Sequence, residues 1–328
     1  MARIFLLGAT GTIGRATLQA LVEQGHDVIC FVRRRQVPSN QMTLAATLDP
    51  FAGAEIRYGD VSCAQSLAEE GFRGEPFDAL ISCMASRTGA PKDAWAIDHD
   101  AHQLVLGAAK LAGVSHFILL SAICVQKPLL AFQHAKLAFE KALIESGIPY
   151  SIVRPTAFFK SLSGQVERVR KGKSFLLFGD GSLAACKPIS DDDLGHYLAE
   201  CLSHQDRRDK ILQIGGPGDA ITPMQQGERL FALLGREPKF KHVPVRFLDA
   251  IIAALDTAGW LVPAAKQKAE LARIGRYYAT ESMLVWDAEA GRYDAGATPS
   301  TGTETLFDYY ADLISGEVVV ERGEHTVF

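Results

Sequence analysis

Two residues fifteen positions apart carry side chains that could assist a reaction. Ser121 ends an apolar run, FILLS at 117–121, and Lys136 lies in the helical run LLAFQHAK at 129–136. A hydroxyl and an ammonium group at one edge of a fold could contact a bound ligand and share in proton transfer. The alternative interpretation of Lys136 is an exposed helix lysine. We expect Ser121 and Lys136 to be the catalytic residues.

The position four residues before the lysine holds a phenylalanine. Serine and lysine at this spacing are typical of short-chain reductases, in which a tyrosine at that position protonates a substrate oxygen. Phe132 cannot donate a proton. Because a positioned acid contributes about 10²–10⁴ to the rate of such a reaction, simple carbonyl reduction is disfavoured. Hydride addition to a C=C bond conjugated to a large aromatic ring delocalises the charge, so the sequence indicates a substrate of that kind.

Glycines recur near the start of the chain, between an apolar run and a helical segment. LLGATGTIG has glycines at positions 8, 11 and 14. Glycine permits a tight turn, close approach of backbone N–H groups to a pyrophosphate, and close helix-to-strand packing. A tight turn without a ligand is the alternative. We predict a dinucleotide site formed by Gly8, Thr10, Gly11, Thr12, Ile13 and Gly14.

The second predicted strand ends in a basic run, RRR at 33–35, and no Asp or Glu occurs between positions 28 and 48. An acidic residue there would bind the ribose of NAD, whereas an arginine can pair with a 2′-phosphate. We therefore expect NADPH, with Arg33 and Arg34 as its contacts. A solvated basic loop is the alternative.

Later strand ends supply the remaining predicted cofactor contacts. Asp60 follows the third strand and could accept a hydrogen bond from the adenine amino group or simply shape a turn. Residues after the fourth strand should lie beside the cofactor, and Lys136 should contact the nicotinamide ribose. The predicted contacts are Asp60, Cys83, Ala85, Ser86, Lys136 and Pro155.

These residues need a framework that brings strand ends together. Apolar runs such as RIFLLG at 3–8, DVICFV at 27–32 and DALISCM at 78–84 alternate with helical segments. The alternation predicts an α/β fold with a Rossmann-type, doubly wound parallel sheet. We expect an NAD(P)-binding domain at 1–155 and a smaller, mostly helical substrate-binding lobe at 156–328. A return strand near 210–216 should join the sheet.

The composition of the chain indicates which kinds of partner and location to expect. The 328 residues carry a formal charge of −4 without long runs of like charge, which disfavours nucleic acid. Six cysteines without a C-x-x-C pair, and histidines without ligand spacing, predict no metal site. The chain opens almost at once on a strand, so we expect no signal or transit peptide and a cytoplasmic location. The longest apolar stretch, 247–262, is too short and too charged to cross a membrane.

Five longer stretches resemble one family, the NADPH-dependent divinyl chlorophyllide a 8-vinyl reductases of the atypical short-chain type. They are SRTGAPKDAWAIDHDA (86–101), LLSAICVQKPLLAFQHAKLAFE (119–140), YSIVRPTAFFKSLSGQVE (150–167), FGDGSLAACKPIS (178–190) and IGRYYATESMLV (274–285). The resemblance covers nearly the whole chain. It implies reduction of the 8-vinyl group of 3,8-divinyl (proto)chlorophyllide a in chlorophyll or bacteriochlorophyll synthesis. It also implies a photosynthetic bacterium as the source, or a processed chloroplast form, with loose association with a membrane or with pigment enzymes left open.

A chlorin would need a broad apolar slot with polar groups at its rim. For that slot we predict an aromatic set and one cation, although core packing is the alternative for each ring. The predicted substrate contacts are Phe158, Phe159, Lys160, Phe178 and Trp260. Two other functions stay open from the sequence: a non-catalytic NADPH-sensing regulator and an assembly subunit of a membrane complex.

Overall fold

The computed structural model describes residues 1–33, 51–260 and 262–318, and at its centre lies a parallel sheet of seven strands. Their order is β3-β2-β1-β4-β5-β6-β8, and each neighbouring pair is parallel. The predicted α/β doubly wound fold is confirmed. The strands are β1 (Arg3–Leu7), β2 (Asp27–Val32), β3 (Ala54–Tyr58), β4 (Ala79–Ser82), β5 (Phe117–Leu120), β6 (Tyr150–Pro155) and β8 (Lys210–Ile214).

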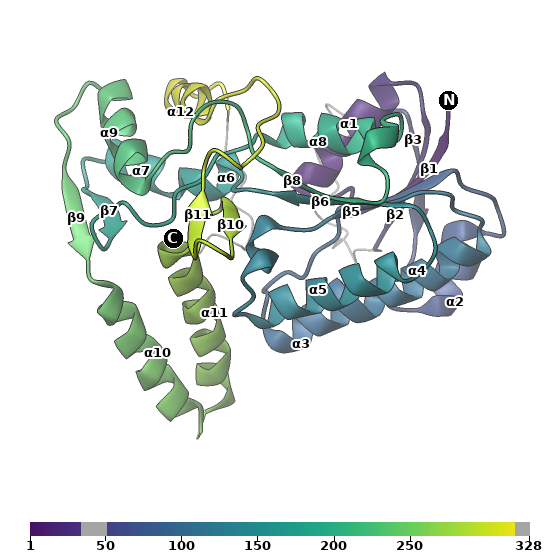
Figure 1. The fold of residues 1–328 in the computed structure, drawn as a ribbon, viewed down its shortest axis with the longest axis horizontal. Coiled ribbons are helices and arrows are strands. Elements are labelled where there is room, and N and C mark those ends of the chain that lie inside the picture. Colours follow the sequence, from purple (N-terminus) through teal and green to yellow (C-terminus); the bar gives the residue numbers. More distant parts are fainter. Residues whose placement is uncertain (34–50, 261, 319–328) are drawn as a thin grey trace, which may run out of the picture.

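Helices cover both faces of the sheet (Figure 1). In β1, Ile4 and Leu6 face a core shared with α1 (Thr12–Glu23) and α8 (Asp191–Glu200). Phe5 and Leu7 face the opposite core, shared with α4 (His102–Leu111) and α5 (Ala131–Ile144). Because both faces are buried, the strands are apolar without alternation, as expected of a parallel sheet.

Shorter helical segments lead into the main ones. On the side of α4 and α5 they are α2 (Ala64–Ser66), the π-helical η1 (Leu67–Phe72), α3 (Pro91–Ala94), the π-helical η2 (Trp95–Ala101) and the 3₁₀ turn η3 (Ile123–Gln126). The segments α3, η2 and α4 follow one another without a break. Asp98 lies in this run, and Lys136 and Glu140 lie on α5.

The second lobe packs around its own apolar cluster, centred on Leu177, Leu230 and Tyr310. Strands β7 and β9 pair in parallel, and β10 and β11 pair antiparallel. The chain returns to the main sheet at β8, so the two regions interleave, and the division at residue 155 stays a prediction. The lobe's elements are α6 (Phe159–Leu162), η4 (Ser163–Gln165), α7 (Val166–Arg170), β7 (Phe175–Phe178), α9 (Pro223–Leu233), β9 (Phe240–Val243), α10 (Val245–Gly259), α11 (Pro263–Thr280), β10 (Val285–Asp287), β11 (Arg292–Asp294) and α12 (Leu306–Ser315). The 3₁₀ turn η5 (Gln205–Arg207) belongs to the sheet region, between α8 and β8.

Helices α10 and α11 form a hairpin that projects away from the sheet (Figure 1). No side chain of α10 is buried. The C-terminal end of α11 packs against the rest of the protein, since Ile274 and Tyr277 form a cluster with Phe132 of α5. None of the helices that the structure describes is long and apolar enough to cross a membrane.

Candidate functional site

The carboxyl edge of the sheet collects most of the residues predicted to bind the cofactor. In a parallel sheet the loops after successive strands meet at this edge, where ligands bind. The turn after β1, Arg33 after β2, Asp60 after β3, the loop after β4 and the end of β6 all lie there. Arg34 lies outside the described residues.

The glycine turn has the form of a phosphate cradle. Gly8 has a φ of 79°, and a Cβ atom there would lie 2.6 Å from the carbonyl carbon of Cys83. A Cβ atom at Gly14 would lie 2.1 Å from the carbonyl oxygen of Gly8. Helix α1 begins at Thr12 without a side-chain cap, which leaves backbone N–H groups for an anion. The turn therefore fits the pyrophosphate of a dinucleotide.

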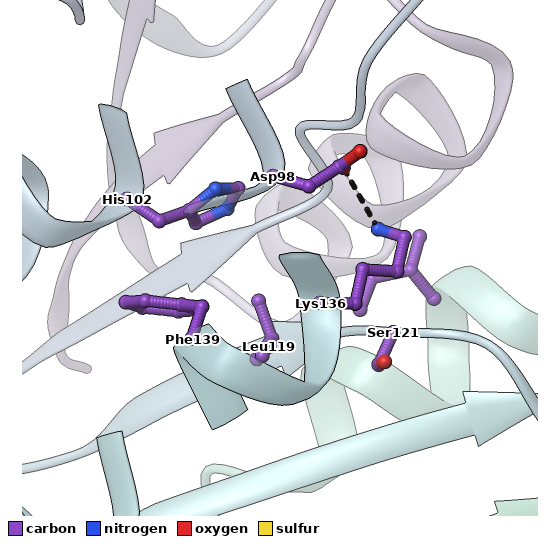
Figure 2. A pocket seen from close by; sticks show the side chains of 7 residues that line it. Asp98, His102, Leu119, Ser121, Lys136 and Phe139 are labelled. Carbon is purple, nitrogen blue, oxygen red and sulfur yellow. Dashed lines mark ion pairs between the residues drawn. The ribbon is translucent and has the colours of Figure 1, made fainter. Parts of the chain in front are cut away.

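Lys136 is paired with a carboxylate that the sequence analysis missed. Its Nζ lies 3.0 Å from Oδ1 of Asp98, in the π-helical segment η2 (Figure 2). The side chain of Asp98 has no exposed surface, and that of Lys136 is 12% exposed. Oδ1 of Asp98 also accepts the backbone N–H of Ser86 at 3.1 Å. One carboxylate thus links Lys136 to the loop after β4.

His102 lines the same pocket as Asp98 and Lys136, and its ring is uncharged. Its Nδ1 lies 2.7 Å from the carbonyl oxygen of Ile97, which can only accept, so Nδ1 carries the proton. Nε2 then accepts from the Ser82 hydroxyl at 2.9 Å. Burial lowers the pKa of His102 to about 4. His102 contributes hydrogen bonds to β4 and no charge at neutral pH.

The hydroxyl of Ser121 is committed to another partner. It donates to Oε1 of Glu140 at 2.5 Å, and Glu140 forms a buried ion pair with Arg154. Figure 2 shows this hydroxyl turned away from the Lys136 ammonium. A catalytic role for Ser121 stays a prediction, and it requires the hydroxyl to leave Glu140.

Phe132 fills the position of the missing acid with an apolar contact. Its side chain is 8% exposed and packs with Ile123, Ala135 and Ile274. Tyr277 belongs to the same cluster, but its hydroxyl donates to the carbonyl oxygen of Cys124 at 3.0 Å. Neither ring offers a proton at this position.

The predicted substrate aromatics do not share one surface. Phe158 is partly buried beside the sheet core, and Phe178 ends β7 in the second lobe. Phe159 is 4% exposed, because α6 directs its ring into the lobe core beside Tyr309. This burial agrees with the core-packing alternative, and its contact with the substrate stays a prediction. Trp260 is 92% exposed at the tip of the α10–α11 hairpin, where no slot surrounds it.

Lys160 lies toward the phosphate cradle. Its Nζ is 3.5 Å from the hydroxyl oxygen of Thr12, at the start of α1. Burial raises the pKa of nearby Asp191 to about 6, and the charge of Lys160 opposes that rise. This placement favours a contact with cofactor phosphate over the predicted contact with the pigment.

The remaining predictions concern polar residues near the turns. The carboxylate of Asp60 accepts the N–H of Ser62 at 2.8 Å, which agrees with the turn interpretation, and the adenine contact stays a prediction. Arg33 is exposed directly after β2. Within residues 1–33, 51–260 and 262–318, no group of histidine, cysteine and acidic side chains could hold a metal ion.

Comparison with known proteins points to one activity. Residues 8–205 match the model of a family described as NAD(P)H-binding. The chain is 48% identical to divinyl chlorophyllide a 8-vinyl-reductase of Cucumis sativus, over 99% of this chain and 79% of that protein. For the Arabidopsis thaliana protein of the same name, identity is 46% over 98% and 79%. An NADPH-dependent quinone oxidoreductase from Escherichia coli shares the fold, with a TM-score of 0.66, 20% identity, and coverage of 95% and 99%.

Proposed function

The chain belongs to the divinyl chlorophyllide a 8-vinyl reductases, within an NAD(P)H-binding family, and from this premise we propose that it reduces the 8-vinyl group of 3,8-divinyl (proto)chlorophyllide a to an ethyl group. The observation that carries the proposal is 48% identity to a named reductase along 99% of the chain. The types of residue at the sheet edge are consistent with this reaction. They form a phosphate cradle and a buried cation, with no acid at residue 132.

When bound, NADPH supplies the hydride to one vinyl carbon, and a proton is added to the other. The turn after β1 and Lys160 would hold the phosphates, and Arg33 would pair with the 2′-phosphate that distinguishes NADPH from NADH. Lys136 would hold the nicotinamide ribose. Because the ring delocalises charge, the proton needs no acid fixed beside the reacting bond.

The experiment mixes purified protein with 3,8-divinyl chlorophyllide a and NADPH, with NADH in parallel. Product is followed by chromatography and Soret absorbance. The proposal expects a blue-shifted monovinyl product with NADPH and much less with NADH. Failure to convert either the divinyl chlorophyllide or the protochlorophyllide, by a protein that still binds NADPH, would contradict it and favour the NADPH-sensing regulator.

The cytoplasm of a photosynthetic bacterium is the location we propose, while the plant relatives are named as chloroplastic. We also propose that the hairpin tip contacts an anionic membrane surface. Trp260 and Val262 are 92% and 50% exposed there, and Lys266 and Lys268 follow on α11. Aromatic and apolar side chains flanked by lysines suit a lipid interface.

Charge supports lipid over a protein partner. The acidic side chains Asp249 and Asp256 of α10 are paired with Arg276 and Arg273 of α11, so the lysines dominate the tip.

Sedimentation with phosphatidylcholine vesicles, with and without phosphatidylglycerol, tests the contact. Binding should require the anionic lipid and be lost in Trp260→Ser and in Lys266→Glu/Lys268→Glu. Leu111→Ser is the control, because Leu111 is equally exposed, at 92%, on α4. Equal binding by all variants, or none by the wild type, would refute the membrane contact.

A further inference from the structure

One buried carboxylate joins two cofactor-facing elements. Oδ1 of Asp98 contacts Nζ of Lys136 on α5 and the N–H of Ser86 after β4, at 3.0 and 3.1 Å. Both elements reach the carboxyl edge of the sheet, where the nicotinamide end of the cofactor is expected. Asp98 therefore determines where the ammonium of Lys136 lies relative to that edge.

The other oxygen of Asp98 is unusual. Oδ2 is buried and has no hydrogen-bond partner among the described residues. An ionised carboxylate can accept about four hydrogen bonds, and a buried acceptor left unsatisfied reduces stability. A carboxylate kept only to stabilise the fold would be expected to satisfy both oxygens. The incomplete satisfaction of Asp98 is better explained by a role in the site.

The local helix geometry agrees with such a role. Asp98 lies in η2, a π-helical stretch of seven residues within the continuous helical run from α3 to α4. π-Helical turns are uncommon and occur frequently at functional sites. The hollow beside Asp98 is lined by Lys136, Ser121 and His102 (Figure 2). His102 is neutral and adds no positive charge there, so the Asp98 carboxylate at 3.0 Å is free to compensate the ammonium of Lys136.

We propose that Asp98 is the positioning residue for Lys136, compensating its charge and holding the ammonium where it meets the nicotinamide ribose. The inference deepens the proposed function, because it rests on the cofactor contact proposed for Lys136. It assigns to a carboxylate on the neighbouring helix the task of orienting this lysine, next to a position where Phe132 can orient nothing by hydrogen bonding.

The first test compares binding of the whole cofactor with binding of its adenosine half alone. Asp98→Asn keeps the side-chain shape and removes the charge. Binding of NADPH, followed by nicotinamide fluorescence, should weaken by about tenfold or more, as expected on losing a charged hydrogen bond. Binding of 2′,5′-ADP, which lacks the nicotinamide half, should stay within about twofold of wild type. Equal losses for both ligands, or no loss for NADPH, would overturn the proposal.

A control and a double variant guard against general destabilisation. Glu75→Gln removes a carboxylate 2.7 Å from the buried Arg57, in the segment leading into the amino end of β4, and should leave both affinities unchanged. If Asp98→Asn fails to fold, Lys136→Met is compared with Lys136→Met/Asp98→Asn, which leaves no unpaired buried charge. Equal NADPH affinity in these two variants supports action through Lys136, and a further loss in the double variant contradicts it.

These measurements need no pigment, so they separate the two proposals. A protein that shows the predicted split in binding but never reduces a divinyl substrate would retain the role of Asp98 and lose the proposed reaction. A wild-type protein that does not bind NADPH would overturn both.

Discussion

At the scale of single residues, the site holds the Lys136 cation in place and has no proton donor at residue 132. The ammonium lies 3.0 Å from Asp98, while the ring of Phe132 packs against Ile274 with 8% of its surface exposed. A ketone reductase would need a donor at residue 132, since charge builds on one oxygen. A vinyl group conjugated to a macrocycle does not need such a donor, because the charge is delocalised. This accounts for a site that has the lysine but no tyrosine at residue 132.

Replacing Lys136 by alanine should reduce turnover by about 10²-fold, because misplacing the nicotinamide ring by even about 1 Å has an effect of that size. Lys141→Ala is the matched control. Lys141 lies on the same helix, is 75% exposed and pairs with Glu145 across the surface. Steady-state kinetics with the divinyl substrate make the measurement, and unchanged kinetics in the Lys136 variant would refute its role.

Restoring a tyrosine, by Phe132→Tyr, should raise turnover by less than about threefold, because a delocalised charge gains little from a local acid. Single-turnover rates measured at saturating NADPH isolate the chemical step from binding. A gain of about 10²-fold would show that the absence of an acid needs another explanation.

Contacts of the site residues could be predicted from the sequence only between residues that lie close together along the chain. The spacing of Ser121, Phe132 and Lys136 could be interpreted directly, since Ser121 directly follows β5 and the other two residues lie on α5. The partners Asp98 and Glu140 could not, because each pairs with a side chain on another element. An acidic residue within the largely apolar run AWAIDHDA was the one available signal for Asp98.

Between elements, close approach of backbones determines how the cradle forms. The turn after β1 contacts the loop after β4 at Gly8, and α1 contacts α8 where a Cβ at Gly195 would lie 2.6 Å from the carbonyl carbon of Ala16. Side chains at these points would push the elements apart. The glycine pattern at the start of the chain was therefore a reliable sign of the turn, whereas Gly195 carried no such pattern.

Gly8→Ala should abolish NADPH binding, because the new methyl group would meet the backbone of Cys83 at 2.6 Å. Gly25→Ala is the matched control. Gly25 also has a positive φ, 73°, at the other end of α1, but nothing lies within 4 Å of its added Cβ. Both variants should lose about 1–2 kcal/mol of stability from backbone strain, and the Gly8 variant should lose more because of its contact with Cys83. Fluorescence titration with NADPH should separate them, and tight binding by the Gly8 variant would contradict the cradle.

Helix starts show where local rules hold. In the sequence, Thr222 followed by Pro223 and Gln225 predicts a capping box at the start of α9. The structure confirms it: the hydroxyl of Thr222 accepts the N–H of Gln225, whose side chain accepts the N–H of Thr222 at 2.8 Å. Ser62 followed by Gln65 predicts a second capping box, and this prediction is wrong, because α2 has no side-chain cap. Asp60 binds the N–H of Ser62 and extends the turn, so α2 starts later, after Cys63.

At the scale of the whole molecule, burial of two histidines gives stability a pH dependence. Burial lowers the pKa of His102 and of His116 to about 4, against about 6.5 in an unfolded chain. Between these values each of the two histidines binds more protons in the unfolded chain than in the native one, so their contribution to stability falls as pH falls from about 6.5 to about 4. Full titration corresponds to about 3 kcal/mol for each ring.

Urea midpoints measured between about pH 7 and pH 4.5 should show this decrease. His116→Gln should reduce the slope, because it removes one of the two rings. His204→Gln, which alters an exposed histidine, should leave the slope unchanged. A slope in His116→Gln equal to that of the wild type would contradict the assignment.

The overall architecture followed from the alternation of apolar and helical segments, but the projecting hairpin did not. From the sequence alone, the apolar stretch at 247–262 is typical of a core or pocket helix, and Trp260 is a predicted contact in the pigment slot. In the structure α10 has no buried side chain and Trp260 lies at the tip. Apolar periodicity identifies a face that avoids water but does not determine what covers it.

The most direct test of the account follows the hydride itself. The divinyl substrate is reduced with NADPH carrying deuterium at the transferable position of the nicotinamide, and the product is analysed by mass spectrometry and NMR. The account predicts one deuterium in the new 8-ethyl group and none at the 3-vinyl group. An unlabelled ethyl group, or label elsewhere on the macrocycle, would contradict direct hydride transfer to the conjugated vinyl group.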